Sequence, residues 1–257
     1  MKIPFTKAHG ARNDFLLTRR IDLPEPFDGV ALARAICDRH TGVGADGWVV
    51  ISDAPDADAA IELWNSDGSS SPISGNGTRC AAAMLMRGAS IRIRTGAGVK
   101  HLQLLNRAGR VHSIEMNMGR AIIEDLKTKV HGQDATIVDV GNPQCAVFVD
   151  RLPDDWVSLG AAIERDPRFP NRTNVSFIRV LDRHTLDLRF FERGAGETMS
   201  SGTGSTGAAA AAHARGLVES PVEVCTPAGP LIARWDRDEI HLAGPAEIVA
   251  EGEFYFD

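Results

Sequence analysis

The chain has 257 residues, of which 43% are hydrophobic and 24% charged, and its formal net charge is −6. These values exclude a disordered, collagen-like or coiled-coil protein and leave room for one large or two small domains with a packed core. No stretch approaches the ~20 apolar residues of a transmembrane helix. We also expect no signal peptide, and no nucleic-acid partner because no Lys/Arg cluster stands out.

Short strands and one helix are predicted in the first half of the chain. Apolar or alternating runs of the strand type occupy 61–64, 91–95, 102–106 and 112–118. The Ala-rich run 79–88 predicts a buried helix that ends at Gly88. Glycine also punctuates the polar segment 37–47, which we expect to be a loop before the apolar run 48–51.

The second half follows a similar course. Residues 120–134 are expected to connect the two halves, and 145–149 to form a strand after Gly141-Asn142-Pro143. A second Ala-rich helix is predicted to end at Gly216. The last segment, 247–257, is predicted to be a strand that returns to the first half.

The two helical regions are copies of one pattern. Ser74–Ala83 reads SGNGTRCAAA and Ser201–Ala210 reads SGTGSTGAAA, an offset of 127 residues. Asn65 and Glu192 each lie nine residues before the serine. Such a repeat indicates two copies of one structural unit rather than convergent turn chemistry.

The repeat therefore predicts an α+β protein of two pseudo-symmetric, strand-rich rolls, each wrapped around a central helix. Because each helix is apolar nearly all round, we expect it to be buried within a curved sheet. The expected domains are residues 1–117 joined by a C-terminal strand at about 246–257, and residues 118–245. Strands outnumber helices, which favours a mixed, largely antiparallel sheet over a doubly wound parallel one.

Each Gly-rich turn is placed at a helix N-terminus, where unpaired N–H groups attract carboxylate or phosphate. Either Ser74 and Ser201 merely cap their helices, or the two helix ends share one small anionic ligand in a cleft. The duplication favours the ligand site. Four asparagines beside strand ends are compatible with ordinary turns, but together suggest a polar ring for amine and carboxylate groups: Asn13, Asn65, Asn142 and Asn174.

No metal or cofactor site is visible. Cys37, Cys80, Cys145 and Cys225 lack metal-ligand spacing and are interpreted as free thiols in a reducing cytoplasm. A phosphate-binding loop and a dinucleotide fingerprint are also missing, so we expect no cofactor. The sequence leaves a homodimer open.

Together these motifs resemble the diaminopimelate epimerase family, pyridoxal-independent enzymes of lysine and cell-wall precursor synthesis. The resemblance rests on eight segments in order: 9–15, 37–47, 64–69, 74–82, 141–143, 172–175, 192–198 and 201–204. It implies an α-amino acid held in the cleft between the two rolls. The residues that it assigns to substrate binding are Asn13, Asn65, Gly75, Asn76, Asn142, Asn174, Glu192, Arg193, Gly202 and Thr203.

The chain departs from this family at its chemical centre. The family has a cysteine before each Gly-rich turn, one thiolate removing the α-proton and the opposed thiol returning a proton, whereas this chain has Ser74 and Ser201. A serine hydroxyl is a weak base without help from a neighbour. Gln144 stands where the family usually has His, and Arg12 where it usually has Gly. These further departures favour natural divergence over engineered serines.

Three functions follow as hypotheses. The first is an amino-acid epimerase of the diaminopimelate type, with Ser74, Ser201 and Glu192 as catalytic residues and weak or no activity for want of the thiols. The second is a dehydratase or double-bond isomerase in the same cleft, led by Glu192, with His9 and His40 as weaker candidates. The third is an amino-acid-binding protein without catalysis.

Overall fold

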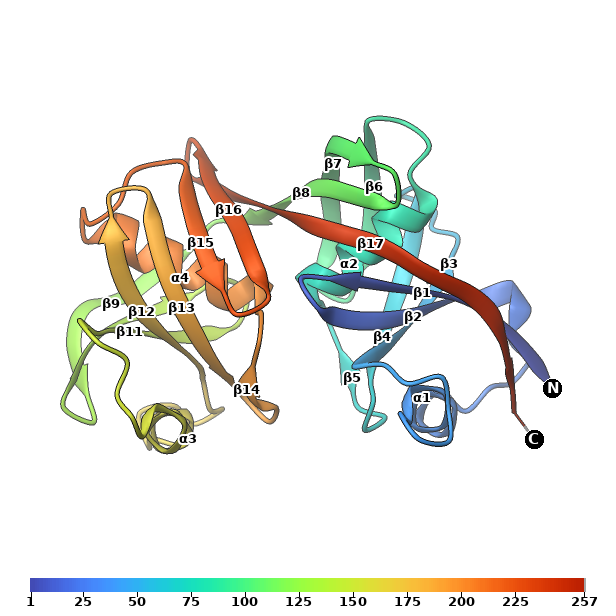
Figure 1. Ribbon diagram of the computed structural model, residues 1–257, viewed down its shortest axis with the longest axis horizontal. Helices are drawn as coiled ribbons and strands as arrows, with labels where there is room; N and C mark the ends of the chain where they lie inside the picture. The colour runs from blue at the N-terminus through green and yellow to red at the C-terminus, as the bar shows by residue number, and fades with distance from the viewer. Residues whose placement is uncertain (257) are drawn as a thin grey trace. The chain divides into compact units, whose positions relative to one another are not determined.

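The computed structural model describes residues 1–256. It divides into two compact units (Figure 1). Unit 1 comprises Met1–Met116 together with the chain from Gly244 onward, and unit 2 comprises Asn117–Ala243. None of the helices within the described residues is both long and apolar enough to cross a membrane.

Unit 1 is built mainly from strands, with two α-helices and one short 3-10 helix. Its elements are β1 (Lys2–Gly10), β2 (Asn13–Arg19), η1 (Arg20–Asp22), α1 (Gly29–Cys37), β3 (Gly47–Ser52), β4 (Ala59–Asn65), β5 (Ser70–Ser71), α2 (Gly75–Leu85), β6 (Ser90–Thr95), β7 (Gly98–Ala108), β8 (Val111–Gly119) and the end of β17 (Glu239–Tyr255). The strands close on themselves in the order β1-β2-β3-β4-β6-β7-β8-β17, and β17 pairs again with β1. The pairs β2–β3 and β4–β6 are parallel.

Unit 2 repeats this plan. Its elements are β9 (Ile122–Val130), β10 (Gln133–Asp139), β11 (Pro143–Phe148), α3 (Trp156–Glu164), β12 (Asn174–Asp182), β13 (Thr185–Glu192), β14 (Gly196–Thr198), α4 (Gly202–Ala214), β15 (Val222–Thr226), β16 (Gly229–Asp236) and the start of β17. Its parallel pairs, β11–β12 and β13–β15, are the counterparts of those in unit 1. Element order and pairing therefore bear out the duplication.

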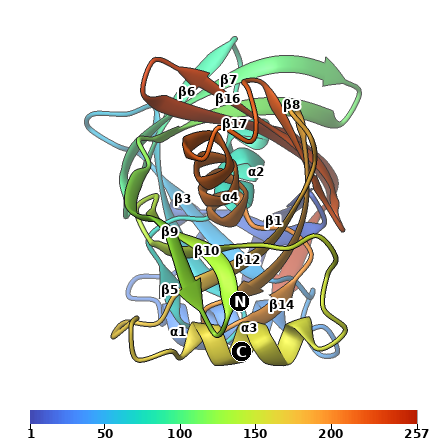
Figure 2. The same ribbon diagram turned by 90° about the vertical axis from the view of Figure 1, so that its left-hand side faces the viewer.

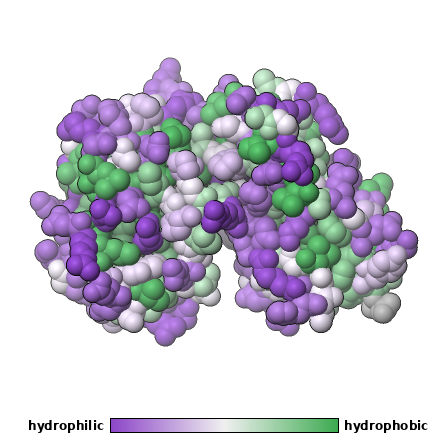
Figure 3. Space-filling model, in the orientation of Figure 1, coloured by the Kyte–Doolittle hydropathy of each residue, from purple (hydrophilic) through white to green (hydrophobic). Residues whose placement is uncertain are grey.

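The two Ala-rich helices form the centres of the units. Helix α2 contacts β1, β2, β3, β4 and β6, and helix α4 contacts β9 to β13 together with β15 and β16. Figure 2 shows the strands of unit 2 curving around α4. Residues Ala208–Ala212 are all buried, because small side chains let strands approach a helix from every side. The hydrophilic colours that cover much of the visible surface in Figure 3 fit this internal placement of the apolar helices.

Most predicted elements are confirmed. The strand runs of the first half, the run 145–149 and the two Ala-rich helices are all present. The C-terminal strand does return to unit 1, where Phe254 is paired with Ile3 of β1. Helix α4 is followed by Gly216 at φ 70, a left-handed residue that glycine adopts readily.

Two expectations were wrong. Residues 120–134 are not a bare connection, because they form β9 and the start of β10, two paired strands of unit 2. Helix α2 does not end at Gly88: Met86 already has extended backbone angles and caps the helix with an N–H to the carbonyl of Ala82. The charged and partly polar run of β9 carries no helical or strand period that would have marked it.

Close packing at the start of α4 gives a test of this architecture. A Cβ on Gly204 would lie 2.9 Å from Cδ1 of Phe190, whereas one on Gly88 would meet nothing within 4 Å. Because Phe190 is buried, we expect Gly204→Ala to cost about 1–3 kcal/mol of unfolding free energy. Gly88→Ala, the control, should change it by less than about 1 kcal/mol. Denaturant unfolding measures both, and equal effects would contradict the tight packing.

Candidate active site

The two serines of the repeat, Ser74 and Ser201, each cap the helix that follows them. In unit 1 the Oγ of Ser74 accepts the N–H of Gly77 at 3.1 Å, and in unit 2 the Oγ of Ser201 accepts the N–H of Gly204 at 3.1 Å. Both serines have the extended backbone typical of an N-cap. Both serines are therefore N-caps of their helices. Capping uses Oγ as an acceptor and leaves the hydroxyl proton available to a further partner.

Ser201 has such a partner in Glu192. The Oγ of Ser201 donates to Oε2 of Glu192 at 3.0 Å, and the Oγ1 of Thr198 donates to Oε1 of the same carboxylate at 2.7 Å. Glu192 ends β13, and the hairpin pairing of β13 with β14 places Thr198 beside it. The carboxylate is thus fixed against the hydroxyl at the start of α4. Thr198 belongs to the 192–198 motif, but nothing in the sequence marked it as a partner of Glu192.

The environment of Glu192 shifts the pKa of its carboxyl group. Burial raises the pKa of this carboxyl, and the hydrogen bonds from Thr198 and Ser201 offset part of the rise. A carboxyl group with a raised pKa can accept and release protons closer to neutral pH than an ordinary glutamate.

Ser74 has no carboxylate partner among residues 1–256. The position equivalent to Glu192 is Asn65, at the end of β4, whose Nδ2 donates to the Oγ of Ser69 at 2.9 Å. Among the described residues of unit 1, the only hydrogen bond to the Oγ of Ser74 comes from Gly77. The duplicated sites are thus chemically unequal.

The other predicted polar residues of unit 2 lie around α4 and β12. The Nδ2 of Asn142 donates to Oγ1 of Thr203 at 3.4 Å, and the Nε2 of Gln144 donates to Oδ1 of Asn142 at 2.7 Å. Gln144 is buried against Gly207, where a Cβ would lie 2.9 Å from its Cγ. Gln144 therefore fixes Asn142 beside Thr203, at the first turn of α4.

The side chain of Asn174 forms hydrogen bonds to the backbone of two other segments. Its Nδ2 donates to the carbonyl of Pro143 at 3.2 Å, and its Oδ1 accepts the backbone N–H of Arg193 at 3.0 Å. The Nη1 of Arg193 in turn donates to the carbonyl of Asn171 at 3.0 Å. Asn174 thus positions the turn that follows Glu192.

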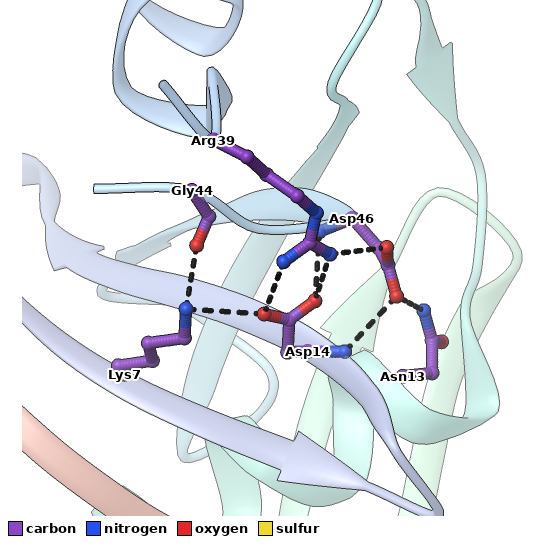
Figure 4. A network of polar contacts seen from close by, with 6 residues as sticks. All are labelled: Lys7, Asn13, Asp14, Arg39, Gly44 and Asp46. Carbon is purple, nitrogen blue, oxygen red and sulfur yellow. Dashed lines mark hydrogen bonds and ion pairs between the residues drawn. The ribbon is translucent and has the colours of Figure 1, made fainter. Parts of the chain in front are cut away.

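In unit 1, Asn13 and Asn76 belong to one polar network, part of which is drawn in Figure 4. Asn13 donates from Nδ2 to Oδ2 of Asp46 at 2.8 Å, and its Oδ1 accepts from Nδ2 of Asn76 at 3.2 Å. Arg39 bridges Asp46 and Asp14, with 2.8 Å contacts to each. Lys7 lies 3.1 Å from Asp14.

This network lowers the pKa of Asp14. Although burial opposes it, the hydrogen bonds from Arg39 and Lys7 hold the pKa of this carboxyl below its usual value. Asp14 is therefore a structural anion. It fixes the loop that carries Asp46 and through it the side chain of Asn13.

The remaining candidates are less suited to catalysis. His9 lies beside Glu247, with Nε2 and Oε2 3.6 Å apart, and His40 is exposed. Arg12 is exposed in the turn between β1 and β2 at φ 60. All four cysteines are free, and burial raises the pKa of Cys37, Cys80 and Cys145 to about 12. Cys80 is a core residue.

The fold is shared with several solved structures. A PhzF-family phenazine biosynthesis protein from Bacillus anthracis matches at a TM-score of 0.75 and 17% identity, covering 100% of both chains. A probable proline racemase from Agrobacterium radiobacter K84 matches at a TM-score of 0.77 and 17% identity, covering 99% of this chain and 93% of the other. The fold class is therefore the duplicated α+β roll of these proteins.

Sequence relatives identify the family. The diaminopimelate epimerase family model matches residues 5–124 and 136–249. A diaminopimelate epimerase from Pelotomaculum thermopropionicum is 38% identical over 97% of this chain and 98% of its own length. One from Burkholderia thailandensis is 36% identical over 98% of both chains. The chain belongs to the diaminopimelate epimerase family.

The raised pKa of Glu192 predicts a pH dependence of stability. A carboxyl group whose pKa is higher in the folded than in the unfolded state stabilises the fold while protonated, and this contribution is lost as the pH rises through the folded-state pKa. Unfolding free energies of the wild type should therefore fall more than those of Glu192→Gln between pH 4.5 and 8. Parallel pH profiles in denaturant unfolding would refute the perturbed carboxyl.

Proposed function

We propose that this chain epimerises diaminopimelate, converting the LL to the meso form by proton transfer at Cα without a cofactor. The Glu192–Ser201 hydrogen bond carries the proposal, since it gives one serine the basic neighbour that an isolated hydroxyl lacks. Membership of the diaminopimelate epimerase family supports diaminopimelate as the substrate. The place of the reaction in lysine biosynthesis follows from that substrate, while a cytoplasmic location and a homodimer stay predictions from the sequence.

Proton removal is assigned to unit 2. The Cα–H bond breaks, its proton passes to Oγ of Ser201, and the hydroxyl proton of Ser201 passes to Oε2 of Glu192. The electron pair stays on the substrate as a carbanion conjugated with its carboxylate. An approaching substrate ammonium would counter the effect of burial on Glu192 and ionise it for this step.

Reprotonation is assigned to Ser74. Its hydroxyl gives a proton to the opposite face of Cα and regains one from water. The proton held by Glu192 then returns to solvent, where it neutralises the hydroxide that is left. Because Ser74 lacks a carboxylate partner within the described residues, reprotonation should be the slower step, and the enzyme should turn over slowly compared with a pair of thiols.

Binding is assigned to the remaining residues of the family pattern. Unpaired N–H groups at the starts of α2 and α4 would hold the α-carboxylate, and Asn65 with Glu192 would hold the α-ammonium. Arg193, Asn174 and Asn142 would bind the distal end of the substrate. The two helix ends contribute through Gly75, Asn76, Gly202 and Thr203, and Asn13 supports Asn76.

A second reaction is favoured by the inequality of the two serines. Because Ser201 has Glu192 beside it and Ser74 has no carboxylate partner among residues 1–256, the same site would suit a dehydratase or double-bond isomerase, in which one group removes a proton and returns it elsewhere. Hydroxylated or unsaturated amino acids would then be the substrates.

Deuterium exchange tests the assigned roles. In deuterated water the wild type should incorporate deuterium at Cα of diaminopimelate, measured by NMR, and Glu192→Gln should slow this by about 10²–10⁴-fold. Glu197→Gln, an exposed neighbour on β14, is the control and should leave the rate within about twofold. Exchange that survives in Glu192→Gln would contradict the relay, and exchange found with hydroxylated or unsaturated amino acids alone would support the second reaction.

Restored thiols test whether the rest of the site is intact. The double variant Ser74→Cys with Ser201→Cys should epimerise diaminopimelate at least about tenfold faster than the wild type, because a thiol of pKa ~8.5 is a far better acid and base than a hydroxyl. Circular dichroism of the purified product stereoisomers measures the gain. A double variant that binds diaminopimelate without any gain in rate would point to the other reaction.

A further inference from the structure

Arg79 is a buried cation without a carboxylate partner among the described residues. It lies in the second turn of α2 with none of its surface exposed. Its Nη2 donates to Oδ1 of Asn76, and its Nε and Nη1 have no hydrogen-bond partner among the described residues. Burial lowers the pKa of this guanidinium to about 10, which leaves it charged at neutral pH.

The neighbouring polar network does not neutralise Arg79. In that network two cations, Lys7 and Arg39, face two carboxylates, Asp14 and Asp46, so its charges balance. Arg79 is joined to it only through the neutral amides of Asn76 and Asn13. A buried charge without a counterion is costly, and an anion bound nearby would offset that cost.

The geometry of α2 places this charge at the helix N-terminus. Long side chains of a helix point back toward its start, and the contact with Asn76 puts the guanidinium beside the first turn. There it adds to the partial positive charge of the free N–H groups. Helix α4 lacks such a charge: its equivalent residue, Thr206, donates from Oγ1 to the carbonyl of Gly202 at 2.8 Å.

We infer that Arg79 is the buried countercharge for a carboxylate that binds at the N-terminus of α2. This inference rests on the proposed function and gives the two helix ends different tasks in it. The start of α2 holds the substrate carboxylate, and the start of α4, with Glu192, carries out proton removal. Arg79 acts through Asn76 and the helix end, so it is a positioning residue rather than a catalytic one.

A thiol placed at the cap measures the charge directly. In a Cys225→Ser background, the variant Ser74→Cys should titrate at least about one unit below the ordinary thiol pKa of ~8.5. Adding Arg79→Gln should raise that pKa by at least about one unit, and Arg79→Lys should largely preserve it. Ultraviolet absorbance of the thiolate follows the titration, since the native thiols Cys37, Cys80 and Cys145 ionise only near pH 12.

The second unit offers a matched control. Ser201→Cys should titrate higher than Ser74→Cys, because it lies beside Glu192 and has no cation like Arg79. Thr206→Val should shift the pKa of the thiol at position 201 by less than about 0.3 units. In unit 1, Arg92→Gln removes an exposed cation and should leave the thiol at position 74 unchanged.

Carboxylate binding gives the functional readout. Acetate, compared with chloride at equal ionic strength, should raise the melting temperature of the wild type but not that of Arg79→Gln. An unchanged thiol pKa in Arg79→Gln, equal acetate protection in both proteins, or failure of Arg79→Gln to fold would each overturn the inference. None of these measurements uses diaminopimelate, so they are independent of the exchange assay that tests the proposed function.

Discussion

The hydrogen bond that a serine cap accepts from the first turn of a buried helix is the constraint on which both sites depend. It fixes the Oγ of Ser74 and of Ser201 at the point where a helix leaves its N–H groups unpaired. Each helix can begin inside its unit only because its side chains are small enough for strands to surround it. The Ala-rich cores of α2 and α4 are therefore a condition for the chemistry as well as for packing.

Duplication made two similar sites, and individual side chains made them different. Glu192 in unit 2 corresponds to Asn65 in unit 1, and Thr206 in unit 2 corresponds to Arg79 in unit 1. One helix end has thereby gained a carboxylate of raised pKa, and the other a buried cation. A pair of equal thiols suits a symmetric exchange of protons, whereas the unequal groups of this chain fit the proposal that proton removal belongs to the start of α4 and carboxylate binding to the start of α2.

The sequence predicted the repeat, the two central helices and the residues around their starts, because glycine-rich caps and Ala-rich runs leave strong local signals. It did not predict α1 and α3, whose apolar faces are short, nor β9, whose charges hide its pairing with β10. It also did not predict that Thr198 donates to Glu192, or that Arg79 lacks a carboxylate partner among the described residues. Such features depend on which side chains meet in space, and neither spacing nor composition records that.

Strand β17 has a consequence for how the polypeptide matures during synthesis. Its first residues pair with β16, while its last ones pair with β1 at the opposite end of the chain. Unit 2 can complete most of its sheet as soon as β16 has left the ribosome, but β1 must wait for β17 before it can pair with that strand. Until then β1 keeps an open edge that other chains could join, so the sheet of unit 1 is protected only after β17 has been made.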